Sequence, residues 1–154
     1  MVEGLTAGQV CNRDVVWVHK TVALNEAARL MRERHVGSLV AIEEAAPGKR
    51  LVAGMVTDRD IVLSVVAKDR DARLLRVEDV MTTEVACARE TDSVLEVLAL
   101  MRRRGVRRVP VTDGHGLLIG IVAVDDLLTQ LSNDLRSLVQ LITAQPGHEQ
   151  LARP

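Results

Sequence analysis

Aromatic side chains other than histidine are almost absent: the 154 residues include one Trp and neither Phe nor Tyr. The interior must therefore be packed with aliphatic side chains, and a planar ligand would lie between aliphatic groups and backbone rather than on rings. The same lack excludes the aromatic platforms on which proteins stack single-stranded nucleic acid. Lys and Arg number 20 against 21 Asp and Glu, so no basic excess is available to neutralise a phosphate backbone. We expect no nucleic-acid partner.

Cysteines and long apolar runs are also scarce. Cys11 and Cys87 stand far apart and outside any CxxC spacing, which indicates neither a disulfide framework nor a zinc site. No apolar run approaches the roughly 18–20 residues of a membrane helix, and the first residues do not have the pattern of a signal peptide. We therefore expect a reduced, cytoplasmic protein with no membrane partner.

Catalytic motifs are missing as well. The chain has no GxSxG, no P-loop and no HExxH, and its four histidines show no metal-ligand spacing with one another or with the cysteines. We expect no enzymatic activity, no catalytic residue, no catalytic cofactor and no bound metal.

An internal repeat is the strongest signal that the chain does contain. The segment LMRERHVGSLVAI, from Leu30, aligns with LMRRRGVRRVPVT, from Leu100. Further on, LVAGMVTDRDIV, from Leu51, aligns with LLIGIVAVDDLL, from Leu117. The two alignments differ in offset because EEAAPGKR in the first copy is replaced by the shorter DGHG in the second, and both stretches contain turn-forming residues. A length change confined to a loop supports the repeat.

Each copy has the pattern of one βαββα unit. A short apolar run, 15–18 or 85–88, is followed by apolar residues at helical spacing and then by two apolar runs on either side of the loop. A second helix is expected to start near Asp58 in the first copy and near Val124 in the second. The only tryptophan, Trp17, falls on the first expected strand, which we expect to lie near the clefts between the copies.

The expected fold class is α/β (α+β), with the two tandem units packed as a pseudo-twofold pair around a shared core. One unit alone would bury too little apolar surface to be comfortably stable. Leucines at helical spacing continue past the second copy and predict an extended C-terminal helix, whose apolar stripe packs on the module, on a second subunit or in a partner's groove. The expected boundaries are 9–66 for repeat 1, 67–76 for a linker, 77–133 for repeat 2, 134–145 for the helical extension and 146–154 for a disordered tail.

The segments GMVTDRDI (54–61) and GIVAVDDL (120–127), each between a strand and a helix, resemble the signature that closes a CBS domain. Two copies in one chain resemble a CBS pair, or Bateman module, and the resemblance covers residues 10–133. It implies a standalone regulatory module that binds AMP, ADP, ATP, NAD or S-adenosylmethionine. It also implies a homodimer of four repeats that passes an energy-sensing signal to an effector protein, whose identity the sequence does not give.

Thr57 and Asp60 are the side chains that we expect to anchor the ligand. They lie one turn apart where a strand meets a helix, so Asp60 is free to accept the ribose hydroxyls while the Thr57 hydroxyl donates to a phosphate. Arg59 would add a cationic contact. The alternative is that Thr57 only caps the helix and Asp60 only favours its first turn.

The resemblance implies the rest of the pocket. Each site would combine the closing motif of one repeat with the loop before the first strand and the start of the second strand of the other. For the site at Thr57 this implies residues from both copies, namely Gly37, Ser38, Met55, Thr82, Ala86, Val106, Arg107 and Arg108. An exposed basic edge is the competing interpretation of the two arginines.

The second closing motif departs from the pattern. Ala123 replaces the hydroxyl residue, and Asp125 stands where the first copy has Arg59. A phosphate there would lose a donor and meet a negative charge. We therefore expect the related site, formed by Asp126, Ile121 and residues 37–39, to be weak, empty or adapted to another ligand.

Two other functions remain open. The chain could be a ligand-free scaffold for protein interactions, in which the C-terminal helix recruits the partner. It could also be a redox sensor that uses Cys11 or Cys87, because both lie near the start of a repeat; burial as small apolar side chains is the simpler interpretation of these cysteines.

Overall fold

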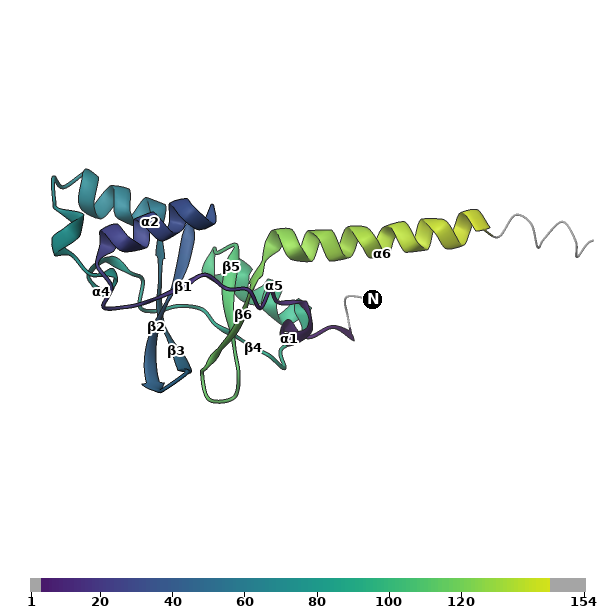
Figure 1. Ribbon diagram of the computed structural model, residues 1–154. Coiled ribbons are helices and arrows are strands. Elements are labelled where there is room, and N and C mark those ends of the chain that lie inside the picture. The colour runs from purple at the N-terminus through teal and green to yellow at the C-terminus, as the bar shows by residue number, and fades with distance from the viewer. Residues whose placement is uncertain (1–3, 145–154) are drawn as a thin grey trace, which may run out of the picture.

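The first repeat forms one three-stranded sheet with helices packed on it (Figure 1). The computed structural model describes residues 4–144 of the chain. Strands β1 and β2 are parallel, and β2 and β3 are antiparallel. The elements are β1 (Trp17–His19), α2 (Leu24–Arg34), β2 (Ser38–Ala46), β3 (Lys49–Thr57) and α3 (Asp58–Ile61), which continues as a π-helical turn, Val62–Val66.

The second repeat has the same order and the same sheet topology. Its elements are β4 (Ala88–Arg89), α5 (Val94–Arg104), β5 (Arg108–Thr112), β6 (Leu118–Ala123) and α6 (Val124–Ala144). The predicted pair of βαββα units and the α/β class are thus confirmed. The expected shared core is wrong, because the buried residues of the described chain form two separate clusters, one against each sheet. The expected tail, 146–154, lies outside the described residues.

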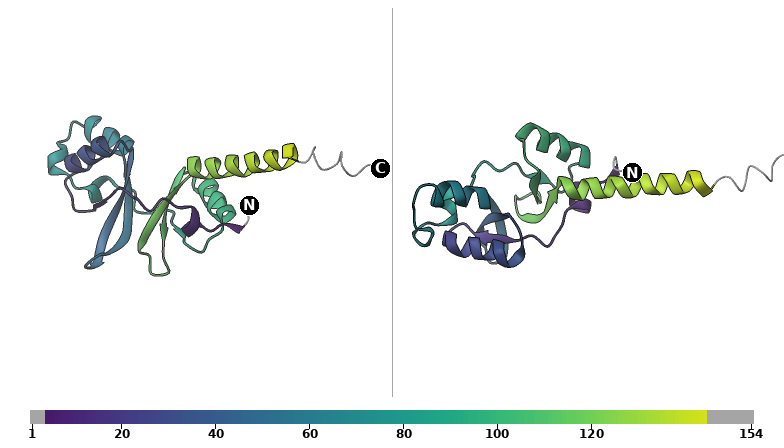
Figure 2. Two further views of the ribbon diagram at one scale, coloured as in Figure 1. Left: turned by 45° about the vertical axis from the view of Figure 1, so that its right-hand side comes forward. Right: turned by 90° about the horizontal axis from the view of Figure 1, so that it is seen from above.

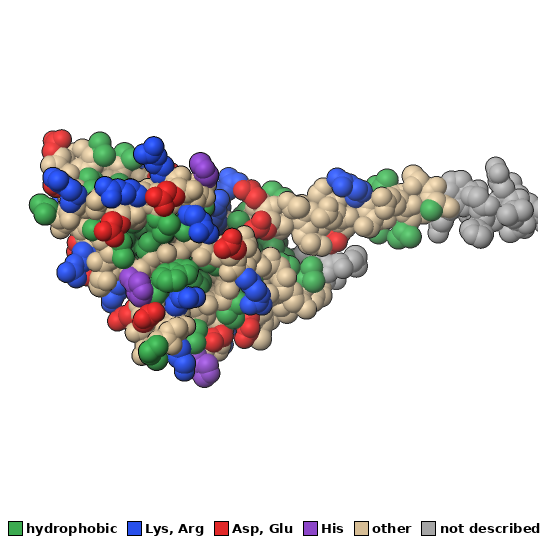
Figure 3. Space-filling model, in the orientation of Figure 1, with side chains coloured by type: hydrophobic (Ala, Val, Ile, Leu, Met, Phe, Trp, Pro, Cys, Tyr) green, Lys and Arg blue, Asp and Glu red, His purple; other side chains and the backbone are tan. Residues whose placement is uncertain are grey.

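Helix α6 is much longer than its counterpart in the first repeat, as the leucine spacing predicted. It has 21 residues, and only Leu127 is buried. Figure 2 shows from two further directions that α6 projects away from both repeats. On the face seen in Figure 3, charged side chains gather over the repeats, and few lie on α6.

The hairpin of the first repeat differs from the expectation. Residues 43–50 were expected as a loop, yet β2 runs to Ala46 and β3 begins at Lys49. The left-handed backbone of Gly48, with φ +76°, allows the chain to reverse within so short a turn. Glu43 and Glu44 pair with Leu51 and Arg50, beyond the packed part of the sheet. Both glutamates are exposed there, so this part of the hairpin has a polar sequence like that of a loop.

The segments that precede each repeat are exchanged between the two cores. Helix α1 (Ala7–Val10) packs on the second repeat, where the Ala7 N–H donates to the Asp92 carbonyl at 2.7 Å. Helix α4 (Val77–Val80) packs on the first repeat, where the Val77 N–H donates to the Val22 carbonyl at 2.9 Å. The expected boundaries follow the chain, whereas each packed core combines segments from both sides of them.

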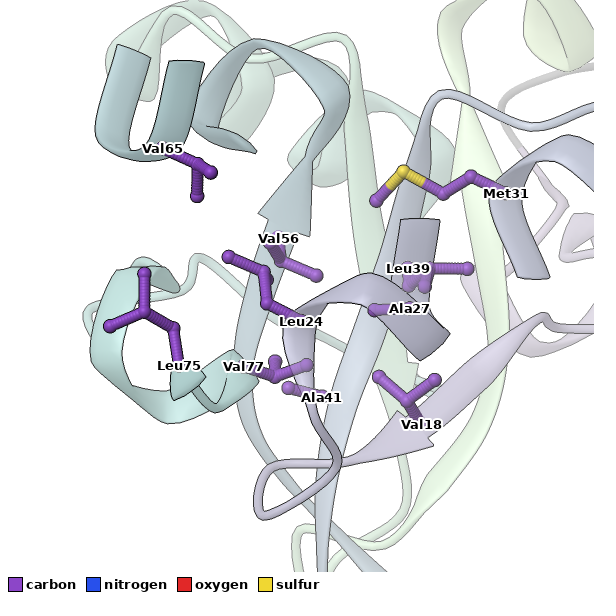
Figure 4. Packing of buried hydrophobic residues seen from close by; sticks show 10 residues of the cluster. All are labelled: Val18, Leu24, Ala27, Met31, Leu39, Ala41, Val56, Val65, Leu75 and Val77. Atoms are coloured by element: carbon purple, nitrogen blue, oxygen red, sulfur yellow. The ribbon is translucent and has the colours of Figure 1, made fainter. Parts of the chain in front are cut away.

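The linker takes part in this exchange. It contains a short 3₁₀ helix, Ala72–Leu74, and ends at Leu75, which is buried against the first core. The Leu75 carbonyl accepts from the Leu24 N–H at 2.8 Å. Figure 4 shows Leu75 and Val77 among the buried side chains of the first core, with Val77 beside Ala41. Because these contacts cross from one repeat to the other, the two units are held in a defined arrangement.

Glycine is required where each exchanged segment crosses a strand. A Cβ on Gly54, in β3, would lie 2.6 Å from the Thr82 carbonyl oxygen. A Cβ on Gly120, in β6, would lie 2.6 Å from the Cys11 sulfur. Real Cβ atoms do not approach other atoms so closely, so the glycine of each closing motif permits the exchange.

Candidate functional site

A cavity of about 930 Å³ opens at the seam between the repeats. Its volume falls within the range of roughly 300–1,000 Å³ that small-molecule sites occupy. Every residue predicted for the first site lines it, from both repeats: Gly37, Ser38, Met55, Thr57, Arg59, Asp60, Thr82, Ala86, Val106, Arg107 and Arg108.

Thr57 and Asp60 cap α3 reciprocally at the edge of this cavity. The Asp60 N–H donates to the Thr57 hydroxyl oxygen at 3.1 Å, and the Thr57 N–H donates to Asp60 Oδ2 at 2.9 Å. Thr57 and Asp60 therefore do form the helix cap that was the alternative interpretation of these residues. It does not use up either side chain, because the Thr57 hydroxyl still has its proton to donate and Asp60 still has Oδ1 to accept. Both side chains are half-buried, not turned to bulk solvent.

Gly37 and Asp58 fix the backbone beside this cap. The Asp58 N–H donates to the Gly37 carbonyl at 2.9 Å, and Asp58 Oδ1 accepts from the Arg59 N–H at 2.8 Å. These bonds tie the start of α3 to the start of β2. Arg59 itself is exposed at the rim, where its guanidinium can reach an anion in the cavity.

The opposite wall comes from the second repeat and the segment exchanged with it. Thr82 and Met55 form a backbone bridge, with N–H···O distances of 3.0 and 2.9 Å. Arg108 donates to the Ser38 hydroxyl at 3.4 Å and so links the two repeats directly. An exposed basic edge was the competing interpretation of Arg107 and Arg108. Both arginines line the cavity, so they belong to the edge and to the site at once.

The charges around the cavity are mixed. The cavity is lined by four arginines and four carboxylates: Arg59, Arg104, Arg107 and Arg108, and Asp58, Asp60, Glu84 and Asp125. One pair of opposite charges is formed across the rim, between Arg107 and Asp125 at 3.4 Å. Met55, Ala86 and Val106 supply an apolar wall. The cavity can therefore hold a ligand that has an apolar face, hydroxyl groups and a negative charge.

The pseudo-equivalent position in the second repeat is arranged differently. Asp126 Oδ2 accepts from the Ala123 N–H at 3.3 Å, but Ala123 has no hydroxyl to complete the reciprocal pair. Ile121 is bridged to Asn12 as Met55 is to Thr82. Neither Asp126 nor Ile121 lines the seam cavity, although Gly37 and Ser38 do. Asp126 is exposed, whereas Asp60 is half-buried.

Sequence reasoning missed several residues that line the cavity, and it expected Trp17 near the clefts. Glu84 and Val85 lie within the span from Thr82 to Ala86, and including that whole segment would have found them. Arg104 and Gly105 come from the end of α5, where Gly105 adopts φ +63°. Trp17 is outside the cavity lining; the Arg50 guanidinium lies over its ring at 4.4 Å, so its fluorescence is a poor reporter of this site.

The two cysteines lack the environment of a reactive thiol. Burial raises the pKa of Cys11 and of Cys87, although Arg13 partly offsets the effect at Cys11. At neutral pH a raised pKa leaves less of the nucleophilic thiolate. We expect mild peroxide to leave both cysteines unmodified over times that fully oxidise the unfolded chain, as measured by mass spectrometry. Selective oxidation of either cysteine in the folded protein would contradict this.

The described residues offer neither a metal cluster nor a membrane-spanning helix. Within residues 4–144, no three or more His, Cys, Asp and Glu side chains are grouped closely enough to hold a metal ion. In the same range, no helix combines the length and the hydropathy needed to cross a bilayer.

Comparison with known proteins places the chain in a family. The CBS domain model matches residues 7–67 and 77–133. The CBS domain-containing protein YhcV of Bacillus subtilis is 36% identical over 121 residues, which are 78% of this chain and 81% of that protein. Protein MK0525 of Methanopyrus kandleri is 35% identical over 127 residues, and the match covers 82% of this chain but only 63% of the longer protein.

Solved structures share the fold. A putative signal-transduction protein with CBS domains from Burkholderia ambifaria superposes with a TM-score of 0.71 at 32% identity, over 84% of this chain and 95% of that one. The CBS domain pair of protein MJ0100, solved with 5′-methylthioadenosine and S-adenosylmethionine, has a TM-score of 0.70 at 22% identity, over 84% and 97% of the two chains. With two family matches, the repeated sheets and the closing motifs in agreement, the chain belongs to the CBS domain family.

Proposed function

We propose that the chain is a regulatory module that binds an adenine nucleotide, of the AMP or ATP type, in the seam cavity. The observation that carries this proposal is the meeting of Thr57 and Asp60 from one repeat with the segments 82–86 and 104–108 of the other around one cavity. CBS pairs are regulatory modules that bind adenosine-containing ligands. The lining here offers a suitable partner for each part of such a ligand.

Each part of a nucleotide has an assigned contact in this proposal. The ribose hydroxyls donate to Asp60 Oδ1, which the helix cap leaves free. The phosphate accepts from the Thr57 hydroxyl and pairs with Arg59, a charge-assisted contact. The adenine lies against Met55, Ala86 and Val106, since the lining has no aromatic ring.

The proposed regulatory step follows from the position of the cavity between the two repeats. A ligand that contacts both repeats binds best at one relative tilt, so it shifts the population toward that arrangement. We propose that the protein acts in the cytoplasm as a homodimer of four repeats and that an effector protein responds to this shift. No catalytic step is needed.

Isothermal titration calorimetry with AMP tests the proposal. We expect one strong site per chain, because the Asp126 position lacks both the threonine hydroxyl and a place in the cavity. A ligand at about one hundred times its dissociation constant should raise the unfolding free energy by about 2.7 kcal/mol, which a thermal shift detects. ADP, ATP, NAD and S-adenosylmethionine form the comparison panel.

Two results would change the proposal. Two equal AMP sites per chain would contradict the assignment of a single strong site. Absence of binding or thermal shift with every member of the panel would reject nucleotide binding and favour the ligand-free scaffold.

A further inference from the structure

The apolar strip of α6 is the largest feature that nucleotide binding does not use. It consists of Leu128, Leu131, Leu135, Leu138 and Ile142, with Val139 and Leu141 beside its outer half. All seven are between 46% and 72% exposed. No other part of residues 4–144 covers them, because α6 projects away from both repeats (Figures 1 and 2).

The spacing along the strip is that of a coiled coil. From Val124 the apolar residues follow at steps of four, three, four, three and four, through Leu128, Leu131, Leu135 and Leu138 to Ile142. This is an alternation of a and d positions, which places one continuous seam on one side of the helix. A helix that only covered its own domain would need a broader and less regular face.

We propose that this seam pairs α6 with the α6 of a second copy of the chain. The seam is fully apolar, and between Leu127 and Ala144 the only charged residues are Asp134 and Arg136. Coiled coils that select a different partner carry complementary charges at their e and g positions. Here those positions hold Ser132, Asp134, Val139 and Leu141. In a parallel pair Asp134 lies opposite Val139 of the other copy, so no like charges face each other and no charge pair selects a different helix.

The charge of the polar face argues against a membrane surface as the occupant. Helices that lie on anionic membranes carry several Lys or Arg on that face. Within the described part of α6, Arg136 is the only basic residue. The outer face instead holds small polar side chains, including Thr129, Asn133 and Gln140, as in a helix that is solvated on one side and paired on the other.

The size of the seam sets the expected strength. At 1.5 Å per residue, the stretch from Leu128 to Ile142 is about 21 Å long. Two helices in contact over this length bury less than the roughly 1,200 Å² of a standard stable interface. We therefore expect weak, reversible pairing that does not depend on nucleotide.

Disulfide trapping tests the seam directly. Leu135 is an a position at the centre of the strip, so in a parallel pair a cysteine there meets its counterpart across the seam. In air-oxidised protein, Leu135→Cys should give mostly a covalent dimer that reductant dissolves. The control Asn133→Cys, on the outer face, should give no more covalent dimer than the unsubstituted protein, whose two cysteines are half-buried. Equal trapping at both positions, or none at Leu135, would overturn the proposal.

Sedimentation equilibrium supplies the second test. The variant Leu131→Glu/Leu138→Glu should raise the dimer dissociation constant at least tenfold, because charges enter the seam. Ser137→Glu/Gln140→Glu adds the same charge outside the seam and should leave it unchanged. Both variants should keep the circular dichroism and the AMP affinity of the monomer. A monomeric wild-type chain, a leucine variant that dimerises as well as the wild type, or monomers that float with phosphatidylserine vesicles would each overturn the proposal.

Discussion

Replacing Asp60 by alanine is expected to weaken AMP binding by about 10- to 100-fold. The reason is the loss of a charged acceptor for the ribose hydroxyls, since hydrogen bonds to charged groups contribute about 1.5–3 kcal/mol each. Titration calorimetry of the folded variant measures the change directly.

Two comparisons separate ligand binding from helix capping, because Asp60 also accepts from the Thr57 N–H. Asp60→Asn keeps an oxygen for that cap while losing the charge, so most of the affinity loss should remain. Asp126→Ala removes the corresponding acceptor in the second repeat, outside the cavity. Asp126→Ala should lower the free energy of unfolding about as much as Asp60→Ala does, but it should leave the AMP affinity unchanged. Unaltered affinity in folded Asp60→Ala would refute the assigned site.

Gly54→Ala is expected to destabilise the fold strongly for so small a change. The added Cβ would lie 2.6 Å from the Thr82 carbonyl oxygen and 2.7 Å from the Met81 sulfur. A backbone oxygen cannot move aside without displacing the whole exchanged segment. Overpacking of this kind costs about 1–3 kcal/mol, and we expect the upper end. At about 2–4 °C per kcal/mol, the thermal midpoint should fall by several degrees.

Matched glycine variants distinguish this effect from a general cost of alanine. Gly114→Ala meets nothing within 4 Å and should leave the thermal midpoint unchanged. Gly120→Ala makes the corresponding clash with Cys11 and Asn12, so it should destabilise as Gly54→Ala does. Only Gly54→Ala should also weaken AMP binding, because Thr82 lines the cavity and Asn12 does not. Equal midpoints for Gly54→Ala and Gly114→Ala would contradict the explanation.

The repeat was visible in the sequence because it is a local property. Apolar spacing, turn residues and the two closing motifs lie within short windows, so the order βαββα and the starts of α3 and α6 could be predicted to within a few residues. Residues 43–50 were wrongly expected as a loop, because polar residues in a hairpin that extends past the core resemble those of a loop. The family pattern also named eleven of the residues that line the seam cavity, but it missed others, such as Glu84 and Arg104.

Asp126 and Ile121 were assigned to a separate, related site, and neither lines the cavity at Thr57. The sequence shows that Ala123 lacks a hydroxyl, and on that basis a weaker second site was expected. Only the structure shows that Asp126 is exposed, whereas Asp60 is half-buried. Trp17 was expected near the clefts; it does not line the seam cavity, and the Arg50 guanidinium lies over its ring.

The sequence by itself determined the two units, their closing motifs and the heptad spacing of α6, since each depends on residues near one another in the chain. Only the tertiary structure decided that α1 and α4 are exchanged between the cores and that Thr57 and Thr82 line one cavity. Those contacts join segments separated along the chain. Their geometry is set by the close passage of backbone over Gly54 and Gly120, which no local pattern records.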